Sequence, residues 1–323
     1  MISLNKRVMP LVRRLIDDAE ALGCRYFQLE NGAHVIDMGI GVPGGWEAAK
    51  LFTRIDIADL GSVELKDFPL DDKLSVPGVE VFIDKVELAC LLSQIAGLSV
   101  GGGEFAAIGS GPARALAANA KDSKDHCFDH STYRDSGAPA VLGIQMTKLP
   151  DATLAADCAR RCGVKPGELY LLVHPSASVV GAVQVSARII EQTINKMMRV
   201  GFDLSRIVSA RGYCAVSPLS YDELEAMGRI NDCLLYGGAS FFEVRCEDAE
   251  IESVIGKIVT ESSRDYGRLF KDLFIEADKD FYKMDLDIHS PAQVQIYNVK
   301  TGHVFTAGAI RKDLLKKSFF GLD

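Results

Sequence analysis

Apolar side chains recur along this chain with two different spacings, and their alternation predicts a mixed α/β protein. Residues 10–22 carry apolar positions at helical spacing behind Pro10, which suits a first helical turn. Residues 25–40 read as two short strands around Asn31 and Gly32, the commonest tight-hairpin dipeptide. Further strands are expected at 79–84, 137–146, 169–173, 206–216, 232–238 and 240–246, helices at 85–98, 149–163, 178–200, 221–228 and 265–277, and a terminal hairpin at 292–308.

The length of 323 residues exceeds the roughly 250 to 300 residues over which one hydrophobic core keeps growing, so two domains are expected. We place them at residues 1–167 and 168–323, with the boundary near Pro166. A discontinuous domain is the alternative, because sequence alone does not exclude it. A cleft between two such α/β domains would be a natural ligand site.

Composition excludes several classes of partner and compartment. A net charge of −8 opposes nonspecific binding of nucleic acid, which a basic stripe normally marks. Residues 169–187 lack charge and approach membrane-spanning length, but His174 and Pro175 divide them, which favours a strand, a turn and a helix over a membrane segment. Eight scattered cysteines are typical of reduced thiols in the cytoplasm. Cys158 and Cys162, four residues apart on an expected helix, are interpreted as packing thiols.

Arg188 and Glu191 are two charges set inside the apolar segment 178–200. Residues three positions apart share a helix face, and a carboxylate is rarely buried without a partner or ligand that offsets its lost hydration. The pair is therefore either an ordinary ion pair on a wet face or part of a cavity where a carboxylate is useful. The pattern alone leaves both interpretations open.

Two glycine-containing turns are candidate ligand loops. In GSGPAR at 109–114, the amides of a helix start could receive an anion, although the loop lacks the lysine of a P-loop. A tight structural turn is the alternative. Tyr236, Gly237 and Gly238 follow an apolar run, where paired glycines permit a close backbone approach to a ligand or simply a bend.

The sequence gives little support for a metal site or a covalent nucleophile. His126, Cys127, Asp129 and His130 are metal-ligating residue types, but they lie in the polar segment 121–135 and no second ligand cluster accompanies them. We interpret that segment as a solvated loop or helix. His174 beside Ser176 and Ser178 matches no nucleophile signature and is typical of a helix start.

Four long motifs, taken together, closely resemble the methenyltetrahydromethanopterin cyclohydrolases. They occur in the same order, and the likeness extends from LENGAHVIDMGI near the N-terminus to the final KKSF. The motifs are GSGPARALA from Gly109, YLLVHPSASVVGAVQVSARIIE from Tyr170, NDCLLYGG from Asn231 and DFYKMDLDIHSPAQV from Asp280. Segment 121–135 aligns least well with the family.

The resemblance implies reversible hydrolysis of 5,10-methenyltetrahydromethanopterin to the 5-formyl compound in the one-carbon metabolism of a methanogen or a methylotroph. It implies a homotrimer of two-domain subunits with the pterin in the cleft, and no metal or redox cofactor. The catalytic arginine and glutamate of the family fall on Arg188 and Glu191. Glu191 is then the expected general base and acid, and Arg188 orients it and favours its charged form.

The same resemblance makes the two loops candidates for pterin binding. The candidate substrate-binding residues are Ser110, Gly111, Arg114, Tyr236, Gly237 and Gly238. A noncatalytic pterin- or nucleotide-binding protein is the alternative function, and the presence of both Arg188 and Glu191 speaks against it.

Overall fold

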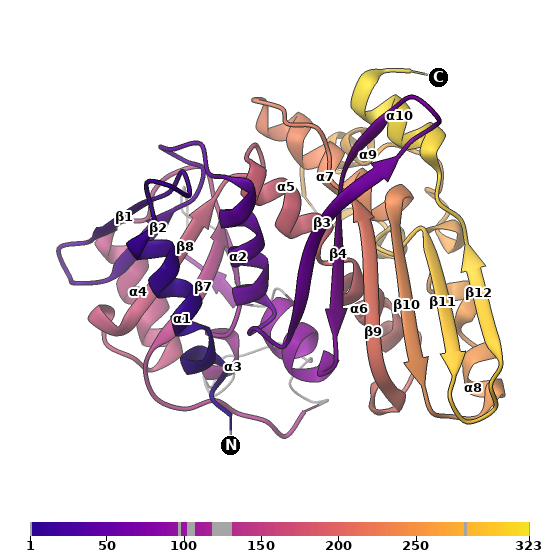
Figure 1. Cartoon of the computed structure of the whole chain (residues 1–323), viewed down its shortest axis with the longest axis horizontal. Coiled ribbons are helices and arrows are strands. Elements are labelled where there is room, and N and C mark those ends of the chain that lie inside the picture. Colours follow the sequence, from indigo (N-terminus) through magenta and orange to yellow (C-terminus); the bar gives the residue numbers. More distant parts are fainter. Residues whose placement is uncertain (1, 96–97, 102–106, 118–130, 281–282, 323) are drawn as a thin grey trace. The chain divides into compact units, whose positions relative to one another are not determined.

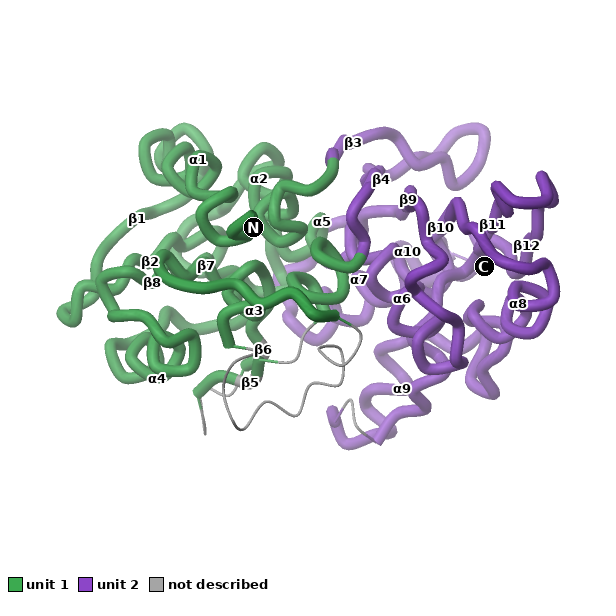
Figure 2. The backbone as a smooth tube through the Cα atoms, turned by 90° about the horizontal axis from the view of Figure 1, so that it is seen from below, with its two compact units in different colours: residues 1–61, 87–184 green, residues 62–86, 185–323 purple. Residues whose placement is uncertain are grey.

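The computed structural model of the protein describes residues 2–95, 98–101, 107–117, 131–280 and 283–322. Its contacts divide the chain into two compact units, coloured separately in Figure 2. Unit 1 comprises Met1–Gly61 and Glu87–Gln184, and unit 2 comprises Ser62–Val86 and Val185–Asp323. The units therefore differ from contiguous halves that meet at residues 167 and 168, because residues 62–86 group with the C-terminal part.

Unit 1 is built on a six-stranded mixed sheet in the order β1-β2-β8-β7-β6-β5. Strands β2, β8 and β7 run parallel, whereas β1, β6 and β5 pair antiparallel with their neighbours. The strands are β1 (Arg25–Gln28), β2 (His34–Asp37), β5 (Leu98–Val100), β6 (Ala107–Ser110), β7 (Ala140–Gln145) and β8 (Leu169–His174). The helices are α1 (Leu4–Asp17), α2 (Trp46–Asp56), the π-helix η1 (Glu87–Gln94), α3 (Arg114–Ala117) and α4 (Ala152–Cys162).

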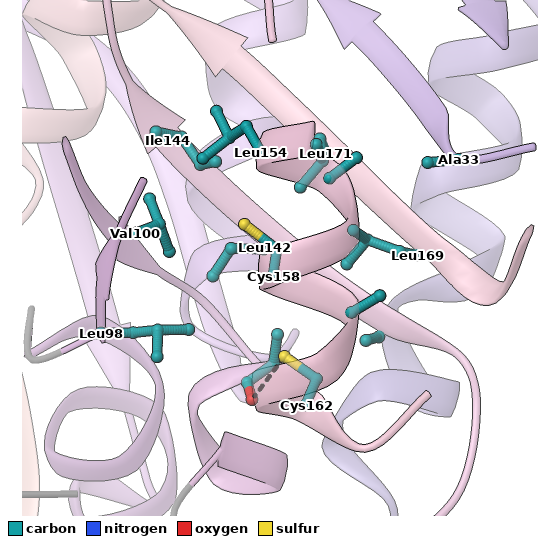
Figure 3. Close-up of a cluster of buried hydrophobic side chains, with 14 of the residues drawn as sticks. Ala33, Leu98, Val100, Leu142, Ile144, Leu154, Cys158, Cys162, Leu169 and Leu171 are labelled. Carbon is teal, nitrogen blue, oxygen red and sulfur yellow. Dashed lines mark hydrogen bonds between the residues drawn. The ribbon is translucent and has the colours of Figure 1, made fainter. Parts of the chain in front are cut away.

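The main core of unit 1 lies between this sheet and α4, as Figure 3 shows. Leu142 and Leu171 from the central strands pack against Leu154 and Cys158 of α4. Asp151 accepts a hydrogen bond from the Leu154 N–H at the start of α4, and Gly163 ends the helix in the left-handed conformation. Cys158 and Cys162 are both buried here, and burial raises the pKa of each thiol to about 12. They are packing thiols, as predicted.

Unit 2 contains a second six-stranded mixed sheet, in the order β12-β11-β10-β9-β4-β3, visible in Figure 1. Only β10 and β11 are parallel among its described pairs. The strands are β3 (Gly61–Pro69), β4 (Ser75–Ile83), β9 (Ile207–Ala215), β10 (Gly238–Val244), β11 (Gln293–Asn298) and β12 (Val304–Gly308). Helices α6 (Ile189–Arg199) and α7 (Glu223–Gly237) pack against β9 and β10, and α8 (Asp248–Glu252), α9 (Phe270–Glu276) and α10 (Lys312–Phe320) complete the unit.

The mixed α/β class is confirmed, and so are the hairpins at 25–37 and 293–308. The uncharged segment 169–187 is the expected strand, turn and helix, since β8 leads into α5 (Val179–Ser186). No helix among the described residues is both long and apolar enough to cross a membrane. Arg311, Lys312, Lys316 and Lys317 form a basic cluster on α10 and its N-cap, and Leu314 and Leu315 of the same helix are buried.

Several predicted elements were wrong in type or extent. The first helix is Leu4–Asp17 and not 10–22, so Pro10 lies inside it and not in its first turn. The helix expected at 85–98 is the shorter π-helix η1, and Leu98 already belongs to β5. Residues 178–200 form two helices rather than one, because the chain breaks between α5 and α6 at Ala187 and Arg188. Residues 232–237 are the end of α7 and not a strand, since a short apolar run does not distinguish a strand from a buried helix. The helix expected at 265–277 is confined to α9, and β3 had no counterpart in the prediction.

Candidate active site

The charged pair at the start of α6 is the most distinctive polar feature of unit 2. Arg188 is the N-cap residue of α6 and Glu191 lies in its first turn. Arg188 Nη1 and Glu191 Oε2 are 3.4 Å apart, and the side chains are only 14% and 12% exposed. This low exposure excludes the interpretation of an ion pair on a wet face. Both charges are largely withdrawn from water, and their interaction is stronger in this environment of lower dielectric constant than it would be in water.

The break between α5 and α6 gives Glu191 a favourable electrostatic position. The Gln192 N–H donates to the Arg188 carbonyl at 2.8 Å and starts the new helix at this point. A helix N-terminus carries a partial positive charge that stabilises a carboxylate in its first turn. Because the helix restarts at Arg188, Glu191 receives this effect together with the charge of the guanidinium. One continuous helix would have placed the pair mid-helix, without the dipole.

The sheet beneath α6 is joined to its first turn by hydrogen bonds. Thr193 Oγ1 donates to the Ile189 carbonyl at 2.7 Å, and Ser240 Oγ of β10 donates to the same carbonyl at 3.2 Å. The two hydroxyl oxygens also lie 2.7 Å apart, and both residues are fully buried. The carbonyl one residue after Arg188 is therefore held from the sheet by Ser240 and from within its own helix by Thr193.

The other end of α6 is held by the motif that begins at Asp280. Lys196 Nζ and Arg199 Nη2 each approach Asp287 Oδ1 at 2.5 Å, and Arg199 Nη1 also donates to the Leu286 carbonyl at 2.8 Å. The hydrogen bond from Lys196 lowers the pKa of Asp287, and the lysine side chain is only 2% exposed. This contact explains part of the DLDIHSP motif, whose side chains the sequence had not assigned to any site.

The predicted loop at 109–114 lies in unit 1, and its polar groups are used within that unit. Ser110 Oγ donates to Asp56 Oδ1 at 2.8 Å, and the Gly111 N–H donates to the Ser93 carbonyl at 2.7 Å. Arg114 is 1% exposed and its Nη1 donates to the Leu91 carbonyl at 3.1 Å. Gly111 has φ of +97°, a conformation that favours glycine, so the tight turn is real.

The second predicted loop is the junction of α7 and β10 in unit 2. Tyr236 is fully buried, its hydroxyl donates to the Arg268 carbonyl at 2.5 Å, and burial raises its pKa above the ordinary value. Gly237 ends α7 and Gly238 begins β10. The residues of this loop share unit 2 with Arg188 and Glu191, whereas Ser110, Gly111 and Arg114 do not.

The described part of the chain contains no group of three or more His, Cys, Asp or Glu side chains placed to hold a metal ion. His126, Cys127, Asp129 and His130 lie outside the described residues. His174 is 1% exposed, and its ring packs edge-on against Phe52 at 4.8 Å between centroids. Ser178 Oγ donates to the Pro175 carbonyl and accepts from the Gly181 N–H, so this serine caps the start of α5, as predicted.

Comparisons with known proteins agree with the motifs. The profile of the cyclohydrolase (MCH) family matches residues 3–319. The methenyltetrahydromethanopterin cyclohydrolase of Methanocaldococcus jannaschii is 38% identical over 321 residues, and that of Methanococcus maripaludis strain S2 is 40% identical over 321, each with 98% of both chains covered. The methenyltetrahydromethanopterin cyclohydrolase of Methanothermobacter marburgensis is 36% identical over 322 residues, with 99% of both chains covered. With the family profile and full-length relatives in agreement, the chain belongs to the methenyltetrahydromethanopterin cyclohydrolase family of enzymes.

Proposed function

We propose that this protein hydrolyses 5,10-methenyltetrahydromethanopterin reversibly to the 5-formyl compound in one-carbon metabolism, with Glu191 as general base and acid. The observation that carries the proposal is the shielded pair of Arg188 and Glu191 at the start of α6. Membership of the family supplies the substrate, since the relatives carry that activity in their names.

The chemistry of the substrate suits a single carboxylate. A methenyl bridge is an amidinium-like cation, so its carbon is already electrophilic and needs a positioned water and a proton acceptor. Glu191 takes a proton as the water oxygen bonds to the bridge carbon. The same carboxyl then gives that proton to the departing aryl nitrogen as the bond between this nitrogen and the bridge carbon breaks. The hydroxyl on the carbon loses its proton as the C=O bond forms, Glu191 passes this proton to solvent, and the neutral formyl group stays on the other nitrogen.

Arg188 has a supporting role in this proposal. Its guanidinium lies 3.4 Å from the Glu191 carboxylate, a distance at which an opposite charge favours the ionised form. The helix N-terminus acts in the same direction. A cationic substrate beside Glu191 adds a third positive charge, so the carboxylate stays ionised until the reaction itself delivers a proton to it.

Pterin binding is proposed for the two loops and remains a prediction. The candidates to receive the charge of the tail or the pterin head are Ser110, Gly111 and Arg114, or the turn formed by Tyr236, Gly237 and Gly238. Because Arg114 donates a hydrogen bond to the Leu91 carbonyl, the substitution Arg114→Ala can also weaken substrate binding by destabilising the fold. Binding of substrates with and without the tail separates a structural role of Arg114 from a role in tail binding. If Arg114→Ala weakens the binding of both substrates equally, Arg114 is not a tail ligand. The cleft location of the pterin, the homotrimer and the cytoplasmic location belong to the same proposal.

The test is the loss of methenyl absorbance in buffer, measured for the wild type, Glu191→Gln and Glu225→Gln. Glu225 is a matched control because it also lies in the first turn of its helix, α7, and pairs with an arginine, Arg229, at 3.2 Å. We expect Glu191→Gln to reduce kcat by about 10²-fold or more with the pterin still bound, and Glu225→Gln to keep wild-type turnover. Near-normal turnover by Glu191→Gln excludes the proposed role. Parallel assays with the tetrahydrofolate analogue test the substrate class.

A further inference from the structure

Two glycines of the unit 2 sheet lie directly beneath the residue that follows Arg188. Gly212 of β9 and Gly238 of β10 project toward α6 from neighbouring strands, on the same face as Ser240. A methyl group on Gly212 would overlap Ile189 and lie 2.8 Å from Ile190 Cγ1. A methyl group on Gly238 would also overlap Ile189 and lie 2.8 Å from the Leu234 carbonyl oxygen. We call Gly212, Gly238 and Ser240 the glycine seat of α6.

The choice of glycine at these positions has a packing reason. Glycine inside a strand weakens it and often marks a close approach by another element. Gly212 is in the middle of β9 and does not have a positive φ, so alanine would fit its backbone and, without a neighbour, would stabilise the strand. The neighbour is Ile189, which is fully buried at the first position of α6.

We propose that the glycine seat positions Glu191 for catalysis by fixing the depth of the first turn of α6. This inference rests on the proposed function of Glu191. Ile189 follows Arg188 and is the first residue of the turn that carries Glu191, and its side chain fills the space that the two absent Cβ atoms leave. Its carbonyl is held from the same sheet by Ser240 and from its own helix by Thr193. The seat thus fixes both the side chain and the backbone of this turn.

The expected displacement follows from the contact distances. Carbon atoms in contact lie about 3.5 to 4.0 Å apart, and a methyl on Gly212 would come closer to Ile189 than the 2.8 Å at which it meets Ile190, so relief of the Ile189 overlap requires a shift of about 1 Å or more. A misplacement of about 1 Å in a catalytic group can reduce the rate about 10²-fold. Gly212, Gly238 and Ile189 are therefore positioning residues, and Glu191 remains the group that touches the reacting atoms.

The test is a double-mutant cycle of Gly212→Ala and Ile189→Ala, with Gly228→Ala as the control. Gly228 lies on α7 of the same unit, and a methyl there would meet Lys271 Cβ at 2.8 Å, a similar clash away from α6. We measure kcat, KM and thermal unfolding for each variant. Gly212→Ala is expected to lower kcat by about 10²-fold with KM close to that of the wild type. Adding Ile189→Ala removes the closer of the two clashes and should recover part of the lost kcat, whereas Gly228→Ala should lose stability without losing kcat.

When Gly212→Ala folds, three results would overturn the proposal: wild-type kcat in Gly212→Ala, a double variant no faster than Gly212→Ala, or an equal kcat loss in Gly228→Ala. If Gly212→Ala does not fold, the double variant must fold and turn over, and its failure also overturns the proposal. The cycle also gives the interaction free energy between Gly212 and Ile189 in unfolding, and this value shows whether the two residues are in contact even in variants that have lost turnover. Normal turnover by Glu191→Gln, by contrast, refutes the proposed function and leaves that interaction free energy intact.

Discussion

Asp232 is a buried carboxyl group that ties three helices of unit 2 together. It lies on α7 with 1% exposure, and its Oδ2 accepts a hydrogen bond from Ser318 Oγ of α10 at 2.6 Å. Its Oδ1 accepts from the Phe270 N–H at the start of α9 at 2.8 Å. Burial raises the pKa of Asp232 from 3.8 to about 7, although both hydrogen bonds favour the charged form. The carboxyl group thus titrates near neutral pH.

The shift in pKa sets the size and sign of a stability change. Each pKa unit corresponds to about 1.4 kcal/mol, so a rise of about 3 units corresponds to about 4 kcal/mol. Between pH 4 and pH 7 the folded state holds a proton that the unfolded state has released, so the free energy of unfolding falls as pH rises. About 3 kcal/mol of that loss falls between pH 5 and pH 8.

The assay compares urea unfolding of the wild type and Asp232→Asn from pH 5 to pH 8. Asparagine keeps an acceptor for the Phe270 N–H and can donate to Ser318 Oγ, but it does not ionise. We expect the stability of Asp232→Asn relative to the wild type to rise by about 3 kcal/mol across this range. His289, whose pKa burial lowers to about 4, acts in the opposite direction but equally in both proteins. Parallel stability curves would refute the reasoning, because they would show that Asp232 does not titrate in this window.

Two further predictions concern the ends of α6. Arg188→Met should lower kcat by about 10²-fold because the carboxylate of Glu191 loses its counter-charge. The control Arg229→Met, which breaks the pair with Glu225, should leave kcat unchanged. Equal kcat values for the wild type and Arg188→Met would contradict the role given to Arg188. Asp287→Ala should lower the free energy of unfolding by about 1 to 2 kcal/mol, and more than Lys196→Met does, because it leaves a lysine of 2% exposure without its carboxylate. The cost is below that of a fully buried pair because the Asp287 carboxylate is itself 53% exposed to water. Denaturant titrations check this order, and a larger cost for Lys196→Met would reverse the argument.

Local pattern predicted the elements whose signals are contained in a few neighbouring residues. The hairpin at Asn31 and Gly32, the capped helix α4 and the strand and helix on either side of His174 were all expected. The break at Arg188 was not, because an apolar run through α5 and α6 reads as one helix. Residues 232–237 were misread for a related reason, since burial on all sides removes the periodicity that distinguishes helix from strand.

By itself the sequence determined the family, the mixed α/β class and the pairing of Arg188 with Glu191, because their separation of three residues is local. Only the tertiary structure decided that this pair is shielded and stands at a helix start. It alone brought Asp287 to Lys196, 91 residues away, and placed Gly212 and Gly238 beneath Ile189. These contacts depend on how sheet and helices pack. No spacing along the chain encodes them, since the residues that meet lie on different elements.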